Sequence, residues 1–345
     1  MMLSMSEFPV MPLAVATLLA VNGIKSRKLC PSGAATAFVV GFLVLAAPVR
    51  GIGITFIVFY LLASWATKYG HKRKAQLEEG FQDAGYRTGW QVLCNSMSAF
   101  IAAIVWSVTF APNVFPWSLL VSVLELPKAP LYDGASWCPL SATISGGLSR
   151  ALLYVVLGKF ACCLGDTLAS ELGILSPSPP ILITTLKPVP PGTNGAISLG
   201  GTVASAVGGF VVGLTLFTSL IVENTACRAE WTEILLPLIF WGTTAGLLGS
   251  MLDTLLGATL QRTRHVCGWW EGVDQGDQRV ERVEQQQGEP DFLDSDSCGS
   301  CTACIRMIVH TTMIFTFVDG HVLSSPSTWE QVAVDVPYLD KSGFD

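Results

Sequence analysis

Two polar segments of this sequence carry residue types that bind anions or metal ions. The first, Gly165–Gly173, reads GDTLASELG and contains Asp166, Ser170 and Glu171. The second, Lys187–Gly201, reads KPVPPGTNGAISLGG. Both lie among apolar runs of membrane length, where carboxylates, lysine and clustered hydroxyls are energetically costly. An anionic or metal-bound substrate group would give these residues a functional reason to be there.

The first segment would be positioned by a helix. If residues 159–173 are helical, Lys159, Asp166 and Ser170 share one face because of their spacing of seven and four residues. Glu171 then projects away from Asp166 and lies above Thr167. The alternative is a helix end, with Asp166 as its cap and Glu171 in a surface turn. Spacing alone leaves both interpretations open.

The second segment follows a proline-rich stretch. Residues 176–192 contain six prolines, so this stretch cannot be helical throughout, and we expect an extended, re-entrant or interfacial loop. Thr185 and Lys187 lie in the middle of it. The run Gly192-Thr193-Asn194-Gly195 then precedes a helix, where its backbone N–H groups could hold phosphate oxygens and the Thr193 and Ser198 hydroxyls could donate to them. The alternative is a plain turn at Asn194-Gly195.

A third polar point is Asp253, a carboxylate within the apolar run GLLGSMLDTLLGATLQ. A carboxylate at such a position is expected to face the bundle interior and to have a partner. Candidates are Lys187, Lys159, or a metal ion shared with Asp166. Alternatively, Asp253 bonds to hydroxyls on its own helix.

Composition identifies the class of protein. The chain has 345 residues, of which 50% are hydrophobic and only 13% charged, and its mean hydropathy is +0.51. Soluble domains carry about 25% charged residues. We therefore predict a polytopic membrane protein surrounded by lipids, in an endomembrane. The basic residues form no patch of the kind that binds nucleic acid, so nucleic acid is excluded as a partner.

Eight apolar runs are compatible with membrane-spanning helices, which need about 20 residues. They predict an all-α polytopic helical bundle of about seven or eight spans, with runs at 9–24, 33–49, 51–66, 92–111, 140–163, 196–222, 233–260 and 303–318. The domain boundaries follow as a membrane domain at 1–263, an acidic disordered loop at 264–302, a last span at 303–322 and a tail at 323–345. Glycine-rich runs among these spans are explained mainly by close helix packing.

The loops differ in charge. The loops fall into two alternating sets. The first set holds thirteen Lys and Arg residues, and the second holds only Arg50, Lys128 and Arg228. The positive-inside rule makes the first set cytosolic. Both polar segments then face the cytosol, where nucleotides are available.

The ten cysteines are not expected to form a disulfide framework, because Cys30, Cys94, Cys162 and Cys163 lie in or beside apolar segments.

One cytosolic loop is strongly basic. It runs from Lys68 to Lys74 (KYGHKRK) and is followed by Glu78 and Glu79. We interpret it as a solvated helix face near anionic lipid headgroups, with Lys74 paired to Glu78. Binding of nucleotide phosphates is the alternative.

Together these motifs resemble the transmembrane protein nineteen family, which also contains the plant phytyl-phosphate kinase. The resemblance covers about residues 28–261 and rests on SGAATAFVVGF, ATKYGHKRKAQLEEGF, GWQVLCNS, GDTLASELG, LITTLKPVPPGTNGAISLGG and GLLGSMLDTLLGATLQ. The sequence departs from the family's pattern at Leu168, at Ala196 and in the segment after residue 317.

The resemblance implies a membrane enzyme that transfers a phosphoryl group from a nucleoside triphosphate to a prenyl monophosphate. Similarity to CTP-using dolichol kinases and phosphatidate cytidylyltransferases implies that Asp166 and Asp253 hold Mg²⁺, with the prenyl tail between small-residue helices. The predicted catalytic residues are Asp166, Lys187 and Asp253. The predicted substrate-binding residues are Thr185, Gly192, Thr193, Asn194, Gly195, Ser198, Ser170 and Glu171. The alternative function is a membrane transporter or lipid-binding protein without catalytic activity, which intramembrane charges and broken segments also suit.

Overall fold

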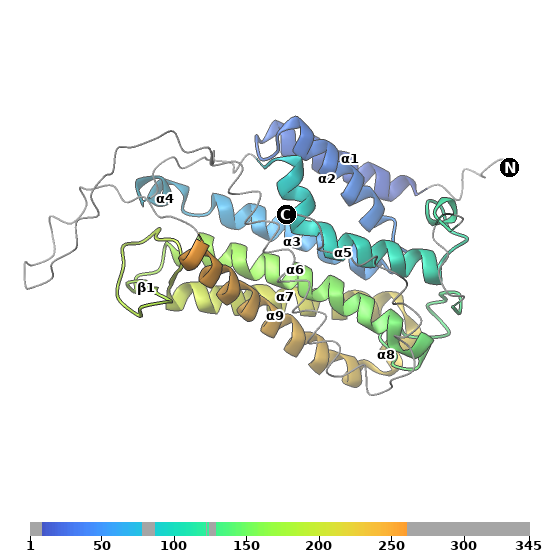
Figure 1. Ribbon diagram of the computed structural model, residues 1–345. Helices are drawn as coiled ribbons and strands as arrows, with labels where there is room; N and C mark the ends of the chain where they lie inside the picture. Colours follow the sequence, from blue (N-terminus) through green and yellow to red (C-terminus); the bar gives the residue numbers. More distant parts are fainter. Residues whose placement is uncertain (1–8, 78–86, 122, 124–128, 261–345) are drawn as a thin grey trace, which may run out of the picture.

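The computed structural model describes residues 9–77, 87–121, 123 and 129–260, and within these ranges the chain is a helical bundle with one very short sheet (Figure 1). This confirms the predicted fold class. The helices and strands are α1 (Val10–Lys25), α2 (Pro31–Leu45), α3 (Arg50–Lys68), α4 (His71–Leu77), α5 (Gly89–Phe110), the 3-10 turns Trp117–Leu119 and Ile144–Gly147, α6 (Leu148–Gly173), β1 (Ile181–Leu182), β2 (Ala196–Ile197), α7 (Leu199–Glu223), α8 (Thr225–Ala229) and α9 (Trp231–Leu260).

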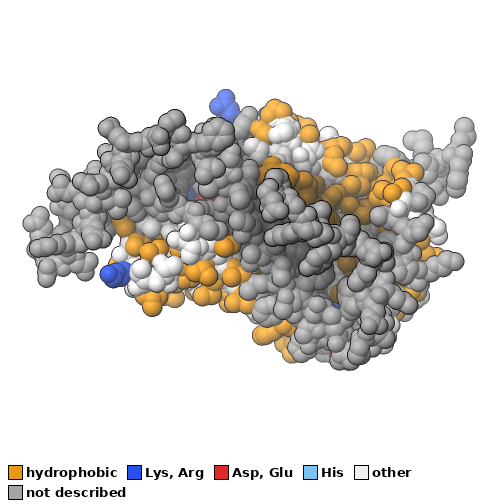
Figure 2. Space-filling view, in the orientation of Figure 1, with side chains coloured by type: hydrophobic (Ala, Val, Ile, Leu, Met, Phe, Trp, Pro, Cys, Tyr) orange, Lys and Arg blue, Asp and Glu red, His pale blue; other side chains and the backbone are white. Residues whose placement is uncertain are grey.

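Seven of the eight predicted apolar runs are helices in the described part of the chain. Five of them, α3, α5, α6, α7 and α9, are long and apolar enough to cross a membrane, and α1 and α2 are shorter apolar helices. The eighth run, at 303–318, lies outside the described residues, as do the predicted loop at 264–302 and tail at 323–345. Figure 2 shows hydrophobic side chains over much of the described surface in that view, which suits contact with lipid.

Three helices, α6, α7 and α9, form the most extensive contacts of the bundle. Their backbones touch at glycines because a membrane offers little hydrophobic drive for association and small residues permit close van der Waals packing. A Cβ added at Gly165 of α6 would lie 2.7 Å from the Gly246 carbonyl oxygen of α9. A Cβ at Gly209 of α7 would lie 2.2 Å from the Gly242 oxygen of α9. These contacts, which we call the glycine seam, confirm that close packing explains the glycine-rich helices.

The two ends of the bundle differ in charge. One, which we call the basic end, carries the end of α1, the end of α3 and the start of α5, where the backbone N–H of Cys30 donates to the Arg87 carbonyl at 3.1 Å. The ends of α6 and α9 and the start of α7 meet there too, and Lys28, Lys68, Lys74 and Lys187 belong to it. At the opposite end, Glu223 accepts hydrogen bonds from the Arg50 and Gly51 N–H groups at the start of α3, at 2.9 and 3.3 Å.

Within the described residues, a single disulfide closes this opposite end, and the sequence did not predict it. Cys138, in the loop before α6, is bonded to Cys227 of α8, with their Cα atoms 4.6 Å apart. Cys138 and Cys227 are 89 residues apart in sequence, so only the packing of the helices brings the loop before α6 next to α8. Cys30, Cys94, Cys162 and Cys163 are not disulfide-bonded.

The disulfide bears on orientation. Disulfides persist in oxidising compartments and are rare where thiols are kept reduced, as in the cytosol. The Cys138–Cys227 bond lies at the end opposite to the basic loops, so it agrees with the positive-inside rule although it rests on different chemistry. We infer that the basic end faces the cytosol.

Orientation can be tested by glycosylation mapping, since the sequence has no Asn-x-Ser/Thr acceptor of its own. An acceptor tripeptide inserted after Asp133 should be glycosylated in microsomes and shift the protein's mass on a gel. The same tripeptide inserted after Thr185 should remain unmodified. Modification of the second variant alone would reverse the assignment.

The glycine seam makes a stability prediction. Gly209→Ala should lower the free energy of unfolding by about 2 kcal/mol or more, because over-packing outweighs the roughly 1 kcal/mol gained in helix propensity. Gly41→Ala is the matched control, since its added Cβ would meet its nearest neighbour, Phe56, at an ordinary 3.6 Å. Thermal unfolding of the purified variants in detergent measures both. Equal stability of the two variants would contradict direct backbone packing at the glycine seam.

Candidate functional site

Asp166 lies inside α6 and is not a helix cap. The helix continues to Gly173, as the same-face argument required, so the alternative of a helix end at Asp166 is wrong. The hydroxyls of the polar residues after Leu164 find partners within the helix, because they donate to backbone carbonyls of the preceding turn. Thr167 Oγ1 donates to the Cys163 carbonyl at 2.8 Å, and Ser170 Oγ donates to the Asp166 carbonyl at 3.0 Å.

Asp166 and Asp253 are brought to the same region of the bundle. Both interact electrostatically with the thiol of Cys163, and so does Lys159, which is also within hydrogen-bonding reach of that thiol. Lys159 is only 2% exposed, whereas the two carboxylates are half-buried. The Cys163 thiol itself donates to the Asn95 carbonyl of α5 at 3.4 Å. We call Lys159, Cys163, Asp166 and Asp253 the polar cluster.

The glycine seam positions the polar cluster. Asp166 directly follows Gly165, whose Cα approaches the backbone of Gly246. Asp253 lies one helical turn after Gly249, where an added Cβ would be 2.7 Å from the Cys162 sulfur. Because side chains larger than hydrogen are excluded at these contacts, α6 and α9 hold the two carboxylates at fixed positions.

The proline-rich segment is extended, as predicted, and folds back on itself. β1 pairs antiparallel with β2, and the Ile183 N–H donates to the Gly195 carbonyl at 3.0 Å. Gly195 is held against α9, because an added Cβ would lie 2.3 Å from the Ala258 Cβ. Ser198 begins α7 by accepting from the Gly201 N–H at 3.1 Å and donates to the Gly173 carbonyl at 3.2 Å. The segment is thus attached to the ends of α6 and α9 beyond the polar cluster.

The predicted phosphate-binding residues have different surroundings. β1, β2 and the residues between them form a hairpin, and four of the predicted residues are exposed on it: Thr185, Lys187, Gly192 and Asn194. Lys187 is therefore not buried beside Asp253. The Thr193 hydroxyl donates to the Pro190 carbonyl at 2.7 Å. Gly192 and Gly195 have φ values of +85° and +82°, and the Ala196 N–H donates to the Thr193 carbonyl at 3.2 Å. The stretch therefore contains the turn that was weighed as the alternative to a phosphate-binding backbone.

Glu171 is engaged in an ion pair that sequence reasoning missed. Its carboxylate accepts from Lys74 Nζ at 2.6 Å, and Lys74 is 1% exposed. The same ammonium group also donates to the Ala66 carbonyl at 2.8 Å. Lys74 is thus buried, which corrects the expectation that it lies on a solvated face, whereas His71, Lys72 and Arg73 are exposed. No local pattern could signal a pair whose members are 97 residues apart, and Glu78, its expected partner, lies outside the described residues.

The polar cluster fits Mg²⁺ better than a metal with an all-protein cage. Among the described residues, no three His, Cys, Asp or Glu side chains are grouped so that they could hold a metal ion. Mg²⁺, however, commonly binds through one or two carboxylates together with substrate phosphates and water. Asp166 and Asp253 supply carboxylates of the right chemistry, so the donor set is compatible with this ion.

These features define a class: a polytopic membrane protein with a polar cluster toward the basic end of its helices. The chain belongs to the family described as integral membrane protein DUF92, whose model matches residues 14–297. It is 34% identical over 252 residues to Protein PGR of Arabidopsis thaliana, which covers 72% of this chain and 77% of that one. It is 29% identical over 252 residues to an uncharacterized membrane protein of Synechocystis, covering 71% of this chain and 77% of the relative. No solved structure matches it.

The Lys74–Glu171 pair gives a prediction that separates structural from substrate-binding roles. Glu171→Gln should lower the free energy of unfolding by about 2–3 kcal/mol, because it leaves the buried Lys74 ammonium without its counter-charge. The exposed neighbour variant Lys72→Gln should leave stability within about 0.5 kcal/mol. Denaturation in detergent without any ligand measures both effects. An unchanged unfolding midpoint for Glu171→Gln would contradict the structural role of Glu171 and favour its predicted role in substrate binding.

Proposed function

We propose that this protein is a membrane phosphotransferase that moves a phosphoryl group from a nucleoside triphosphate to a prenyl monophosphate. The observation that supports it best is the convergence of Asp166 and Asp253 with the buried Lys159. The hairpin attached to the same helix ends adds an exposed lysine and several backbone and hydroxyl groups. The family resemblance of the sequence motifs supplies the substrate class.

Phosphoryl transfer depends mainly on positioning and on stabilising negative charge, and little on covalent chemistry by the protein. Bound Mg²⁺ would neutralise charge on the nucleotide phosphates, and Asp166 and Asp253 would hold it. Lys187 lies exposed on the hairpin and can turn toward a phosphate at the cytosolic end. Asn194 and the exposed backbone at Gly192 would orient the nucleotide. Thr193 and Ser198 act chiefly by shaping the hairpin, since their hydroxyls already donate to carbonyl groups.

Lys159 has a distinct role in this proposal. It is buried beside Cys163 and interacts with the same thiol as both carboxylates, so its positive charge offsets theirs in the apolar bundle. This makes Lys159 a positioning residue for the carboxylates. The acceptor needs no general base, because a phosphate monoester is already anionic at neutral pH.

The prenyl tail requires a different place from the one expected. The seam between α6, α7 and α9 is closed by backbone contacts at Gly165, Gly209 and Gly246, so a tail cannot lie between those helices there. The tail would instead lie along the lipid-facing side of the bundle, where the α7 side chains of Val203 and Val207 are 55% and 49% exposed. An acceptor anchored in the bilayer would then present its phosphate at the cytosolic end.

The proposal is tested with purified protein in lipid nanodiscs, Mg²⁺, labelled nucleotides and prenyl monophosphates of several chain lengths. Asp166→Asn should reduce phosphoryl transfer about a hundredfold or more, as expected when a group that stabilises charge in the transition state is lost. Glu233→Gln removes an exposed carboxylate at the other end of α9 and should keep full activity.

The same preparation distinguishes the alternative. A transporter or lipid-binding protein would move or retain a labelled prenyl phosphate without converting it. Tracer movement across proteoliposomes without any nucleotide turnover would contradict the kinase. Equal activity of Asp166→Asn and the wild type would contradict the assigned site even if transfer is observed.

A further inference from the structure

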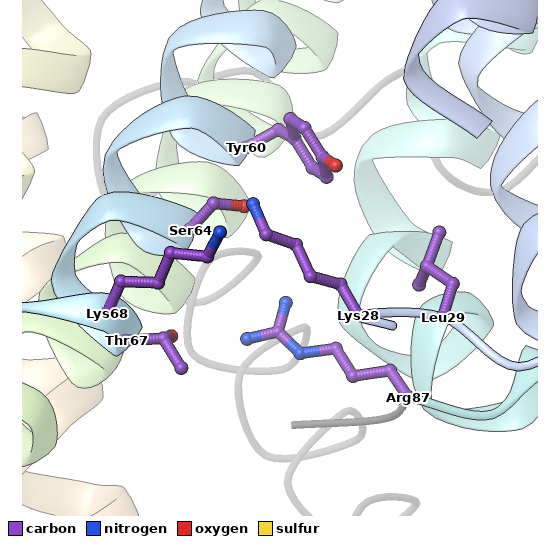
Figure 3. Close-up of a pocket in the computed structure, with 7 residues that line it drawn as sticks. All are labelled: Lys28, Leu29, Tyr60, Ser64, Thr67, Lys68 and Arg87. Carbon is purple, nitrogen blue, oxygen red and sulfur yellow. The ribbon is translucent and has the colours of Figure 1, made fainter. Parts of the chain in front are cut away.

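A pocket at the basic end gathers three cations that the proposed reaction does not use. The space between its lining residues measures about 360 Å³ when the open solvent at its mouth is counted. Figure 3 shows the head groups of Lys28, Lys68 and Arg87 turned toward one another from three separate segments: the loop after α1, the end of α3 and the segment two residues before the start of α5. The seven lining residues are Lys28, Leu29, Tyr60, Ser64, Thr67, Lys68 and Arg87.

The backbone fixes two of these cations in place. The Arg87 N–H donates to the Lys28 carbonyl at 2.9 Å, and the Cys30 N–H donates to the Arg87 carbonyl at 3.1 Å. Gly33 packs against this bridge so closely that an added Cβ would lie 2.2 Å from the Arg87 oxygen. The charged side chains therefore extend from a rigid junction between the loop after α1 and the start of α5.

The charges in the pocket are not balanced by its own lining. None of the described residues that line it is acidic. Burial, then the charges of Lys68 and Arg87, lower the pKa of Lys28 below that of an ordinary lysine. The Lys28 ammonium lies 5.6 Å from the centre of the Tyr60 ring, a contact that offsets only part of this repulsion. Like charges held together in this way favour a bound anion.

The pocket also offers neutral hydrogen-bond donors. The Tyr60 hydroxyl is buried, and although Ser64 and Asn22 lie near it, it makes no hydrogen bond of good geometry within the described residues. A buried polar atom without a partner costs free energy that a ligand can recover. Tyr60 and Ser64 belong to the same helix, one turn apart, and both line the pocket, in which the Ser64 hydroxyl lies beside the Lys28 head group (Figure 3).

We propose that the pocket formed by Lys28, Lys68, Arg87 and the Tyr60 hydroxyl binds a phosphate group. Arg and Lys supply charge-assisted hydrogen bonds to phosphate oxygens, and the arginine can do so through two N–H groups at once. The phosphate can belong to a soluble molecule or to a lipid headgroup, because Lys28 and Lys68 lie at the ends of helices where headgroups are found. None of these residues belongs to the polar cluster, so the inference does not depend on the proposed reaction.

Direct binding tests this site. Wild-type protein in nanodiscs of phosphatidylcholine alone is titrated with inorganic phosphate and pyrophosphate by calorimetry. Lys28→Gln and Arg87→Gln should each weaken binding about tenfold or more, as expected for loss of a charge-assisted hydrogen bond. Lys72→Gln makes the same change in net charge at an exposed position nearby and should alter affinity less than twofold. Unfolding midpoints without ligand confirm that the variants are folded.

A second arm identifies the source of the phosphate. If soluble phosphates do not bind, nanodiscs containing phosphatidic acid are compared by native mass spectrometry of the released protein. Retention of phosphatidic acid by the wild type and Lys72→Gln, with loss in Lys28→Gln and Arg87→Gln, would support a lipid headgroup. Equal affinity of all four proteins for every probe, or binding of none, would overturn the site. Asp166→Asn should bind phosphate normally, which separates this result from failure of the phosphotransferase proposal.

Discussion

Direct backbone contact between α6, α7 and α9 is the constraint on which the rest of this structure depends. Glycines at 165, 208, 209, 242 and 246 let the three helices meet with no side chain between them. Such contacts replace the hydrophobic drive that is missing inside a bilayer with close dispersion contacts. They also fix the rotation of each helix, and this rotation decides which side chains face inward. Lys159 is buried and Asp166 is half-buried on α6, whose rotation the contact of Gly165 with α9 fixes.

The two ends of the bundle are stabilised by different chemistry. At the disulfide end, Glu223 satisfies the first N–H groups of α3, and the buried Asn224 donates to the Trp137 carbonyl at 2.9 Å. At the basic end, charge dominates: a buried ion pair connects α4 to α6, and three further cations converge on one pocket. Structural polar groups are thus paired within the protein at one end, whereas at the other end part of the charge is available to ligands. This asymmetry agrees with a protein that meets anionic molecules on one side of the membrane.

Much of the architecture could be predicted from the sequence. Apolar runs gave the helices, because membrane helices must satisfy their backbone hydrogen bonds internally. Prolines identified the extended segment before α7, whereas the spacing around Asp166 left a continuous helix and a helix end open, and only the structure shows that α6 continues to Gly173. The sequence indicated that Asp166 and Asp253 are close only through the idea of a metal ion shared by both. Their distance depends on how α6 and α9 pack, and no local pattern predicts this.

Long-range partners escaped prediction for the same reason: Lys74 with Glu171, Cys138 with Cys227, and Arg87 with Lys28 are each joined by tertiary structure alone. Lys187 was predicted as a candidate partner of Asp253 but is exposed, because a lysine on a loop can reach solvent as easily as the interior.

The Cys138–Cys227 disulfide divides the chain into a closed ring and two arms. The bond between Cys138 and Cys227 closes a covalent ring that contains α6, the hairpin and α7. Asp166 and the glycine-rich turn lie within this ring, whereas Asp253 lies on the chain that leaves it. A single break in the exposed hairpin would therefore open the ring without separating the protein into two pieces, and the seam would still hold α6 and α7 together. The two fragments would consequently separate under denaturing conditions only after the disulfide is reduced.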